Sequence, residues 1–172
     1  MSMVNVAGNN ATTKVFGLTK DAVQPNAVDL SIEKVFRIKP NLFVIDAENH
    51  KQHRGVEEVL PDEDGFFYLE PDTYEVIAHE TVSVGPDEAG YVIGRSTMNR
   101  NNLLIRSSIY DSGYTGTCCT VITVGSGPAK IQKGTRFAQY VSWKAESLKQ
   151  YNGSYGFGTE DDQKYGISKQ AE

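Results

Sequence analysis

The segment 94–100 (GRSTMNR) brings two arginines and two hydroxyl side chains together directly after an apolar stretch. A small hydroxyl residue that leaves a strand can cap a short helical turn, and the free N–H groups beside it bind an anion. Arg95 and Arg100 would add charge-assisted donors that suit phosphate oxygens. Taken alone, the segment is more often a Ser cap flanked by surface arginines.

The segment 108–116 (SIYDSGYTG) places an aspartate at a tight turn between two apolar stretches. A carboxylate held on a rigid hairpin can serve as a general base, and an aromatic ring can form a flat wall for a sugar. Asp111 and Tyr114 have the residue types for these two tasks. By itself the pattern favours a simpler reading, in which Asp111 makes an Asx turn and Tyr114 packs on the hairpin.

Two later segments carry weaker signals. Gln139 falls on an otherwise apolar face of a predicted strand, so it needs hydrogen-bond partners, either backbone groups or a ligand. The segment 153–159 (GSYGFGT) has glycines around aromatic residues. Such a segment can place a ring on a bound base and offer N–H groups to phosphate, or it can be a disordered tail.

The elements that must position these residues are short strands. The chain has 172 residues, with 16 glycines, nine tyrosines and seven phenylalanines among many Val, Ile and Thr, which favours strands and turns in one domain. Turn residues separate the apolar runs at fairly regular intervals, which predicts a mainly β fold, a distorted β-barrel of jelly-roll-like form. The predicted strands are 27–38, 66–69, 74–84, 91–93, 103–110, 117–124 and 136–143.

Three regions follow from the same pattern. Residues 1–20 are polar and without a clear period, which predicts an N-terminal arm, extended or partly ordered. Residues 21–145 form the β domain, and 146–172 form a flexible C-terminal tail that can act as an active-site lid. The polar stretch 46–60 lies between strands, and the sequence gives it no role.

Composition restricts the partners and the compartment. A net charge of −5 does not indicate binding to a nucleic-acid backbone, and no apolar run is long enough for a membrane-spanning helix. Cys118 and Cys119 are adjacent, so they cannot form an ordinary unstrained disulfide, and no secretory leader is recognisable. We therefore expect a cytoplasmic protein.

In this order and spacing, the four segments resemble the motifs of the dUTPase and dCTP deaminase superfamily. The stretch 24–30 (QPNAVDL) is similar to the opening motif in its dCTP-deaminase-like form, and 67–71 (FYLEP) resembles the same branch. Together the matches cover roughly residues 22–159. The resemblance implies a dUTPase-like β-clip fold, usually assembled as a homotrimer whose sites combine segments from neighbouring subunits, with dUTP as the substrate and Mg²⁺ held through its phosphates and waters.

The resemblance also implies a role for each segment. Asp111 would contact the sugar 3′-hydroxyl and orient the water that attacks the α-phosphate, and Tyr114 would pack on the deoxyribose. The hairpin backbone around Ser108 and Ile109 would read uracil. Phe157, with Tyr155 as its rival, would close over the base, in the same subunit or a neighbouring one. The residues implied to meet the triphosphate are Arg95, Ser96, Thr97, Arg100 and Gln139.

One position separates hydrolysis from deamination. The dCTP deaminases place a glutamate ten residues after the hairpin aspartate, and here that position is Val121. The strand 117–124 has no carboxylate to move a proton, and two adjacent cysteines do not make a zinc site, so deamination is disfavoured. We predict hydrolysis of dUTP to dUMP and pyrophosphate. The alternatives are a dCTP deaminase-like enzyme, a preference for a modified pyrimidine, and a nucleotide-binding regulatory module without catalysis.

Overall fold

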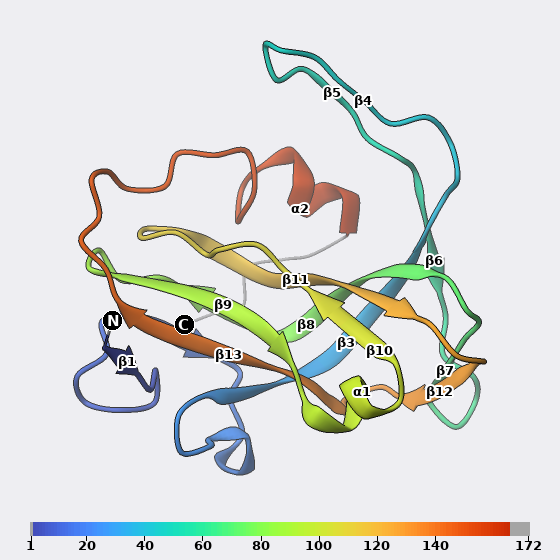
Figure 1. Cartoon of the computed structure of the whole chain (residues 1–172), viewed down its shortest axis with the longest axis horizontal. Coiled ribbons are helices and arrows are strands. Elements are labelled where there is room, and N and C mark those ends of the chain that lie inside the picture. The colour runs from blue at the N-terminus through green and yellow to red at the C-terminus, as the bar shows by residue number, and fades with distance from the viewer. Residues whose placement is uncertain (1, 166–172) are drawn as a thin grey trace.

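The computed structural model describes residues 2–165, which form a curled, mainly β structure (Figure 1). Most strands belong to one nine-stranded sheet with the order β1-β13-β3-β8-β11-β10, in which β2 also pairs with β8, β6 with β3 and β9 with β13. Two small sheets, β12-β7 and β4-β5, complete the fold. The mainly β prediction is confirmed.

Within residues 2–165, the thirteen strands are β1 (Met3–Val4), β2 (Lys14–Phe16), β3 (Val28–Ile38), β4 (Val44–Ile45), β5 (Lys51–Gln52), β6 (Val56–Val59), β7 (Phe66–Leu69), β8 (Thr73–Ser83), β9 (Glu88–Gly94), β10 (Leu103–Arg106), β11 (Thr115–Val124), β12 (Ala129–Gln132) and β13 (Arg136–Lys144). The helical elements are a 3₁₀ turn at Lys20–Ala22, α1 (Ser96–Arg100) and α2 (Glu160–Tyr165).

Strand β3 curls the sheet because its two halves have different partners. Its first half pairs with β13, and its second half pairs with β8 and β6. The pairing with β8 shifts register between Ile32 and Lys34, and the pairing with β13 shifts between Arg136 and Ala138. Such irregularities bend a strand, so one sheet can wrap around a single core.

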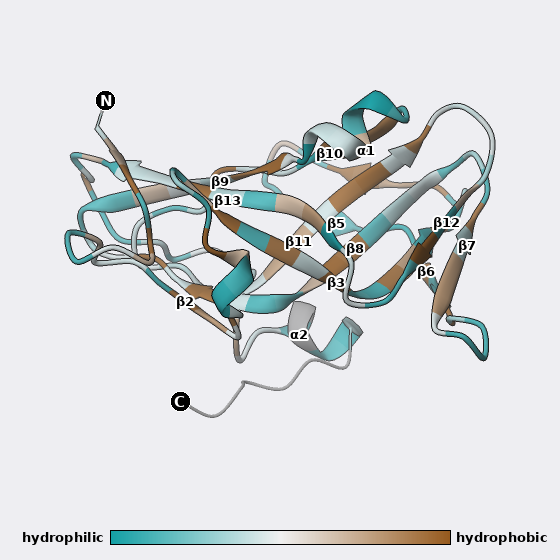
Figure 2. Cartoon of the chain, turned by 90° about the horizontal axis from the view of Figure 1, so that it is seen from below, coloured by the Kyte–Doolittle hydropathy of each residue, from teal (hydrophilic) through white to brown (hydrophobic). Residues whose placement is uncertain are grey.

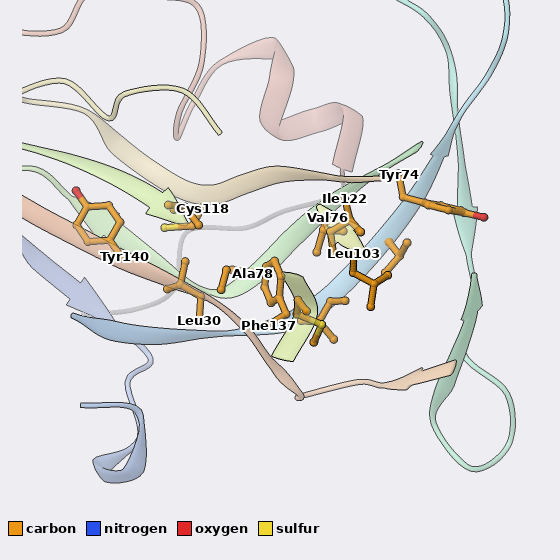
Figure 3. Close-up of a cluster of buried hydrophobic side chains, with 14 of the residues drawn as sticks. Leu30, Tyr74, Val76, Ala78, Leu103, Cys118, Ile122, Phe137 and Tyr140 are labelled. Atoms are coloured by element: carbon orange, nitrogen blue, oxygen red, sulfur yellow. The ribbon is translucent and has the colours of Figure 1, made fainter. Parts of the chain in front are cut away.

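The core fills the inside of this curled sheet (Figure 3). Along β11, Cys118, Thr120, Ile122 and Val124 are buried while Cys119, Val121 and Thr123 between them are more exposed, as the two-residue period of a strand requires. Figure 2 shows the same alternation of hydrophobic and hydrophilic residues along the strands. The burial of Cys118, which raises the pKa of its thiol well above the usual range, makes it a packing residue and not a nucleophile.

All seven strands predicted from the sequence are present, with shifted bounds. The strand predicted at 91–93 extends over the seven residues of β9, while the one predicted at 103–110 ends at Arg106 and leaves only an isolated bridge between Tyr110 and Gly90. Six short strands, including β12, were not predicted. They lack a long apolar run, and their positions depend on partners distant in the sequence.

Three segments lie outside the predicted strands. The N-terminal residues supply β1 and β2, which pair with β13 and β8. The polar stretch before β6 forms the hairpin β4-β5, which projects from the body (Figure 1). The C-terminal segment crosses the body and ends in α2, beyond which residues 166–172 lie outside the described part. No helix within residues 2–165 is long and apolar enough to cross a membrane.

Candidate active site

The sequence-predicted site residues lie in two groups at opposite ends of β9. Gly90, near its start, bridges to Tyr110, the residue before Asp111, and Gly94, at its end, precedes Arg95. Four residues of extended strand separate these points by about 13 Å. Within one chain, therefore, the segment predicted to bind phosphates does not meet Asp111, the predicted general base.

The first group is organised by a carboxylate that is fully buried, that of Asp29 on β3. Gln139 Nε2 donates a hydrogen bond to it at 2.9 Å, and Gln24 Nε2 donates another at 3.2 Å. Arg95 Nε lies 3.6 Å from one Asp29 oxygen and Arg136 Nη1 lies 3.3 Å from the other. The buried charge is thus paired and hydrogen-bonded, as burial of a carboxylate requires.

The helix α1 differs from its sequence prediction in one detail. It begins at Ser96, with Arg95 in the N-cap position, and no side chain caps it. Ser96 therefore does not cap the turn, because it is itself the first helical residue. Ser96 and Thr97 are exposed, and so is Arg100 at the last helical position, while Arg95 Nη1 donates to the Arg136 carbonyl at 2.9 Å.

The second group is built on the turn 111–114. The N–H of Tyr114 donates to the Asp111 carbonyl at 3.0 Å, and Gly113 has a φ of +84°, which glycine adopts without strain. The Asp111 side chain is exposed, and its carboxylate has no hydrogen bond or ion pair among the described residues. Asp111 therefore makes no Asx turn, and its oxygens are available to water or a ligand.

Aromatic rings fix the base of this turn. Tyr114 is buried between Tyr110 and Tyr151, with ring centroids 5.4 Å away on both sides in edge-to-face geometry. Its hydroxyl donates to the Thr117 carbonyl at 3.0 Å, and the Tyr110 hydroxyl donates to the Cys119 carbonyl at 2.9 Å. Burial raises the pKa of Tyr110 well above its usual value, so this residue packs and does not transfer protons.

A cavity of about 1070 Å³ opens beside these rings, between the hairpin strands, the arm β4-β5 and the C-terminal segment. Ser108, Ile109 and Tyr114 line it, as does Tyr155 of the tail. Asp111 lines an adjoining depression of about 660 Å³, and Ile109 and Tyr151 belong to both. The structure thus brings together the residues predicted to hold the base and sugar, with Asp111 at their border.

The charged residues of the cavity wall were not identified from the sequence. Arg106, Lys51 and Lys164 line it, with Glu75 as its only carboxylate among the described residues. Arg106 and Glu75 are the cross-strand neighbours of Val121, on β10 and β8 respectively. Three cationic side chains against one carboxylate favour an anionic ligand. Sequence spacing could not bring these four charged residues together, because they come from three strands and a helix.

The tail follows the cavity rim. The N–H of Phe157 donates to the Thr115 carbonyl at 2.9 Å, and the N–H of Tyr155 donates to the Tyr151 hydroxyl at 3.1 Å. Tyr155 lines the cavity, with Lys51 Nζ of the arm 5.5 Å from its ring centroid, while Phe157 is not part of the lining. Of the two residues predicted to close over a base, Tyr155 is the one placed at the cavity.

The hairpin β4-β5 carries the only cluster of three potential metal ligands in the described part of the chain, Asp46, Glu48 and His50. All three are exposed, and Asp46 accepts hydrogen bonds from the backbone N–H groups of Glu48 and His50 and from the His50 ring. The His50 contacts hold the pKa of Asp46 below its usual value. These bonds close the turn of the hairpin, which is a structural role.

Comparisons with known proteins agree with this arrangement. A family model described as dCTP deaminase-like matches residues 8–145. A probable deoxyuridine 5′-triphosphate nucleotidohydrolase of Halobacterium salinarum is 29% identical over 138 residues, 78% of this chain and 83% of that protein. A dUMP-forming dCTP deaminase of Persephonella marina is 28% identical over 138 residues, with 77% of each chain covered.

Solved structures share the fold at low identity. A dCTP deaminase from Agrobacterium tumefaciens aligns with a TM-score of 0.58 and 18% identity, over 80% of this chain and 45% of that one. A dUTPase from phage phi11 of S. aureus, whose structure is described with a structural Mg(II) ion, aligns with a TM-score of 0.51 and 15% identity, over 84% and 97%. Since the family model spans most of its length, the chain belongs to the dCTP deaminase-like family.

Proposed function

We propose that this protein hydrolyses dUTP to dUMP and pyrophosphate, with Asp111 as the general base. The observation that carries the proposal is the Asp111 carboxylate, which is exposed, has no partner in the described part of the chain, and stands on a fixed turn at the border of the cavity. Relatives named as probable dUTP nucleotidohydrolases, in Halobacterium and Methanopyrus, support it.

In the proposed mechanism the uracil ring occupies the cavity against the backbone of Ser108 and Ile109, and the sugar lies against the edge of Tyr114. Asp111 accepts a hydrogen bond from the sugar 3′-hydroxyl and from a water molecule. It orients that water toward the α-phosphate and takes a proton as the new P–O bond forms and pyrophosphate leaves. Orientation of the reactants and one positioned base supply the catalysis.

The triphosphate requires the other group of residues. Because Arg95 and Gln139 lie at the far end of β9 from Asp111, we propose that Arg95, Ser96, Thr97, Arg100 and Gln139 of a second copy complete the site. A homotrimer, in which each interface repeats the same contact, supplies one complete site per subunit pair. Asp29 would position the phosphate-binding Arg95 in this arrangement.

The residues present fit Mg²⁺ delivered with the nucleotide. Magnesium is typically bound through one or two carboxylates, several waters and substrate phosphates, and the site offers one unengaged carboxylate, Asp111, instead of a cage of ligands. When bound, the ion would neutralise charge on the phosphates and set their geometry. The free thiols of Cys118 and Cys119 fit a reducing cytoplasm, which we propose as the compartment.

Deamination of dCTP is the second candidate, because Glu75 brings a carboxylate to the cavity directly across from Val121. That carboxylate, however, accepts a hydrogen bond from the Tyr165 hydroxyl at 2.5 Å and another from Lys164 Nζ at 3.4 Å. It is therefore already engaged, and hydrolysis remains the better-supported reaction.

The test is a turnover panel. Purified protein is incubated with Mg²⁺ and dUTP, dCTP or dTTP, and pyrophosphate, nucleoside monophosphates and ammonia are measured. We expect dUMP and pyrophosphate in equal amounts from dUTP. Ammonia from dCTP would instead identify a deaminase, and tight dUTP binding without any product would identify a regulatory module.

A further inference from the structure

We infer that Glu75 and Tyr165 are positioning residues that hold the C-terminal segment over the cavity of the same chain. This inference rests on the proposed function, because it identifies what keeps the aromatic wall of the nucleotide site in place. Neither the sequence motifs nor the proposed hydrolysis assigns a role to the Glu75 carboxylate on β8 or to the helix α2.

The anchor is the last described turn of the chain. Tyr165 is 5% exposed and belongs to a small hydrophobic cluster with Phe36 and Ile77, its ring meeting that of Phe36 edge-on at 5.2 Å. Its carbonyl accepts a hydrogen bond from Lys34 Nζ at 3.0 Å. A polar six-residue helix has little stability of its own, so these contacts must fix it.

Glu75 contributes hydrogen bonds to this anchor. Its carboxylate accepts hydrogen bonds from the Tyr165 hydroxyl and from Lys164 Nζ, and its side chain is only 20% exposed. Bonds of this type to an ionised acceptor are stronger than those between neutral groups. Phe36 and Val121 are the cross-strand neighbours of Glu75. Glu75 therefore lies between Phe36, which contacts Tyr165, and Val121, which lines the cavity.

Upstream of the anchor, the same segment is fixed at two further points. The N–H of Tyr151 donates to the Ser112 carbonyl at 2.7 Å, and the N–H of Phe157 donates to the Thr115 carbonyl. Gly156, with a φ of +110°, lies so close to the Thr115 carbonyl oxygen that a Cβ would stand 2.6 Å from it. The chain is thus held on both sides of Tyr155, which faces the cavity.

These contacts fix the segment to the body at three points around the cavity, which is the basis for the proposed closure. Without the Glu75 hydrogen bonds, α2 keeps the packing of Tyr165 and its contact with Lys34, and the segment 151–158 keeps two backbone bonds and the ring contacts of Tyr151 and Tyr155. We expect it then to open more often. An open segment exposes the base to water, so nucleotide affinity should fall while the chemistry at Asp111 is unchanged.

The experiment compares Glu75→Gln, Tyr165→Phe and the double variant, with Glu58→Gln as the matched control. Glu58 faces Phe36 from β6 but is exposed and outside the cavity lining. We expect each single variant to raise the KM for dUTP about three- to tenfold with kcat within about twofold, the double variant to add little, and the control to match wild type.

Amide hydrogen exchange on nucleotide-free protein provides the independent readout. Exchange at Phe157 should accelerate in both single variants and not in Glu58→Gln. Unchanged exchange would overturn the anchoring role, even if KM rises, because Glu75 would then act on the nucleotide directly. A wild-type protein without dUTP turnover would refute the proposed function alone, since the exchange result does not depend on it.

Co-expression of the two single variants separates closure within a chain from exchange between subunits. If the anchor forms within one chain, every anchor in the mixed protein is broken and its KM stays as high as that of either variant. If the tail instead crosses to a neighbour, about a quarter of the anchors regain both native residues and a fraction with native KM appears, which would overturn the inference.

Discussion

At the scale of single residues, the buried carboxylate of Asp29 is the main feature that the sequence indicated only in outline. The stretch 24–30 resembles a motif of the superfamily, but the sequence alone left the partner of Gln139 open between backbone and ligand. In the structure Gln139 donates a hydrogen bond to Asp29, whose carboxylate also lies beside Arg95 and Arg136. The position of Asp29 between the apolar residues Val28 and Leu30 was the available signal.

Replacing Asp29 with Asn should destabilise the protein, because two arginines would lose their shared buried counter-charge. Breaking such a pair costs on the order of 3 kcal/mol, part of which the exposed faces of the arginines recover through water. Urea unfolding should therefore show a lower midpoint for Asp29→Asn. Asp21→Asn, an exposed neighbour on the 3₁₀ turn, is the control and should unfold as wild type does. Equal midpoints for all three proteins would contradict the assigned role.

At the scale of elements, the sequence predicted what local periodicity encodes. The long strands β3, β8, β11 and β13 have apolar runs or alternation bounded by turn residues, and they were found within a few positions of their bounds. The strands β1 and β2 were not, because they are only two and three residues long and depend on pairing with distant strands. The helix α2 was not predicted either, since its contacts with β3 and β8 are invisible in the sequence EDDQKY.

The N-terminal residues are attached through Glu88, which gives a pH dependence. Burial acts to raise the pKa of Glu88, but hydrogen bonds from Lys144 and from the backbone of Thr12 and Thr13 prevail and lower that pKa from 4.5 to about 2. The stabilisation is therefore complete above about pH 4.5 and is lost as the pH falls toward 2.

We expect the free energy of unfolding to fall by about 2 kcal/mol over this range, after allowance for the solvent around Lys144. Glu88→Gln should remove most of that dependence, while Glu58→Gln should leave it intact. Denaturant midpoints measured between pH 5 and pH 2 check this. A Glu88→Gln protein with the full wild-type slope would show that other carboxylates are responsible.

At the scale of the whole molecule, the fold holds the two halves of the proposed site apart. The strand β9 separates the Asp29 group from the Asp111 turn, and the order of the segments along the sequence did not show this separation. Curvature of the sheet and its closure around the core decide this separation, and both depend on long-range pairing.

Mixed assemblies test whether two copies complete the site. Arg95→Ala and Asp111→Asn should each be nearly inactive alone, and co-expressed subunits should recover about a quarter of wild-type activity, because that share of random pairs joins an intact Arg95 to an intact Asp111. Steady-state turnover with light scattering of the assembly provides the measurement. Recovery close to zero would place both residues in the site of one chain.

The most direct test of the proposed function is pyrophosphate release from dUTP by Asp111→Asn under single-turnover conditions, together with dUTP binding by calorimetry. Loss of a general base predicts a rate reduced about 10²- to 10⁴-fold with affinity nearly unchanged. Asp64→Asn, at an exposed turn before β7, should retain the wild-type rate. A rate for Asp111→Asn within a few fold of wild type would contradict the assignment of Asp111 as the base.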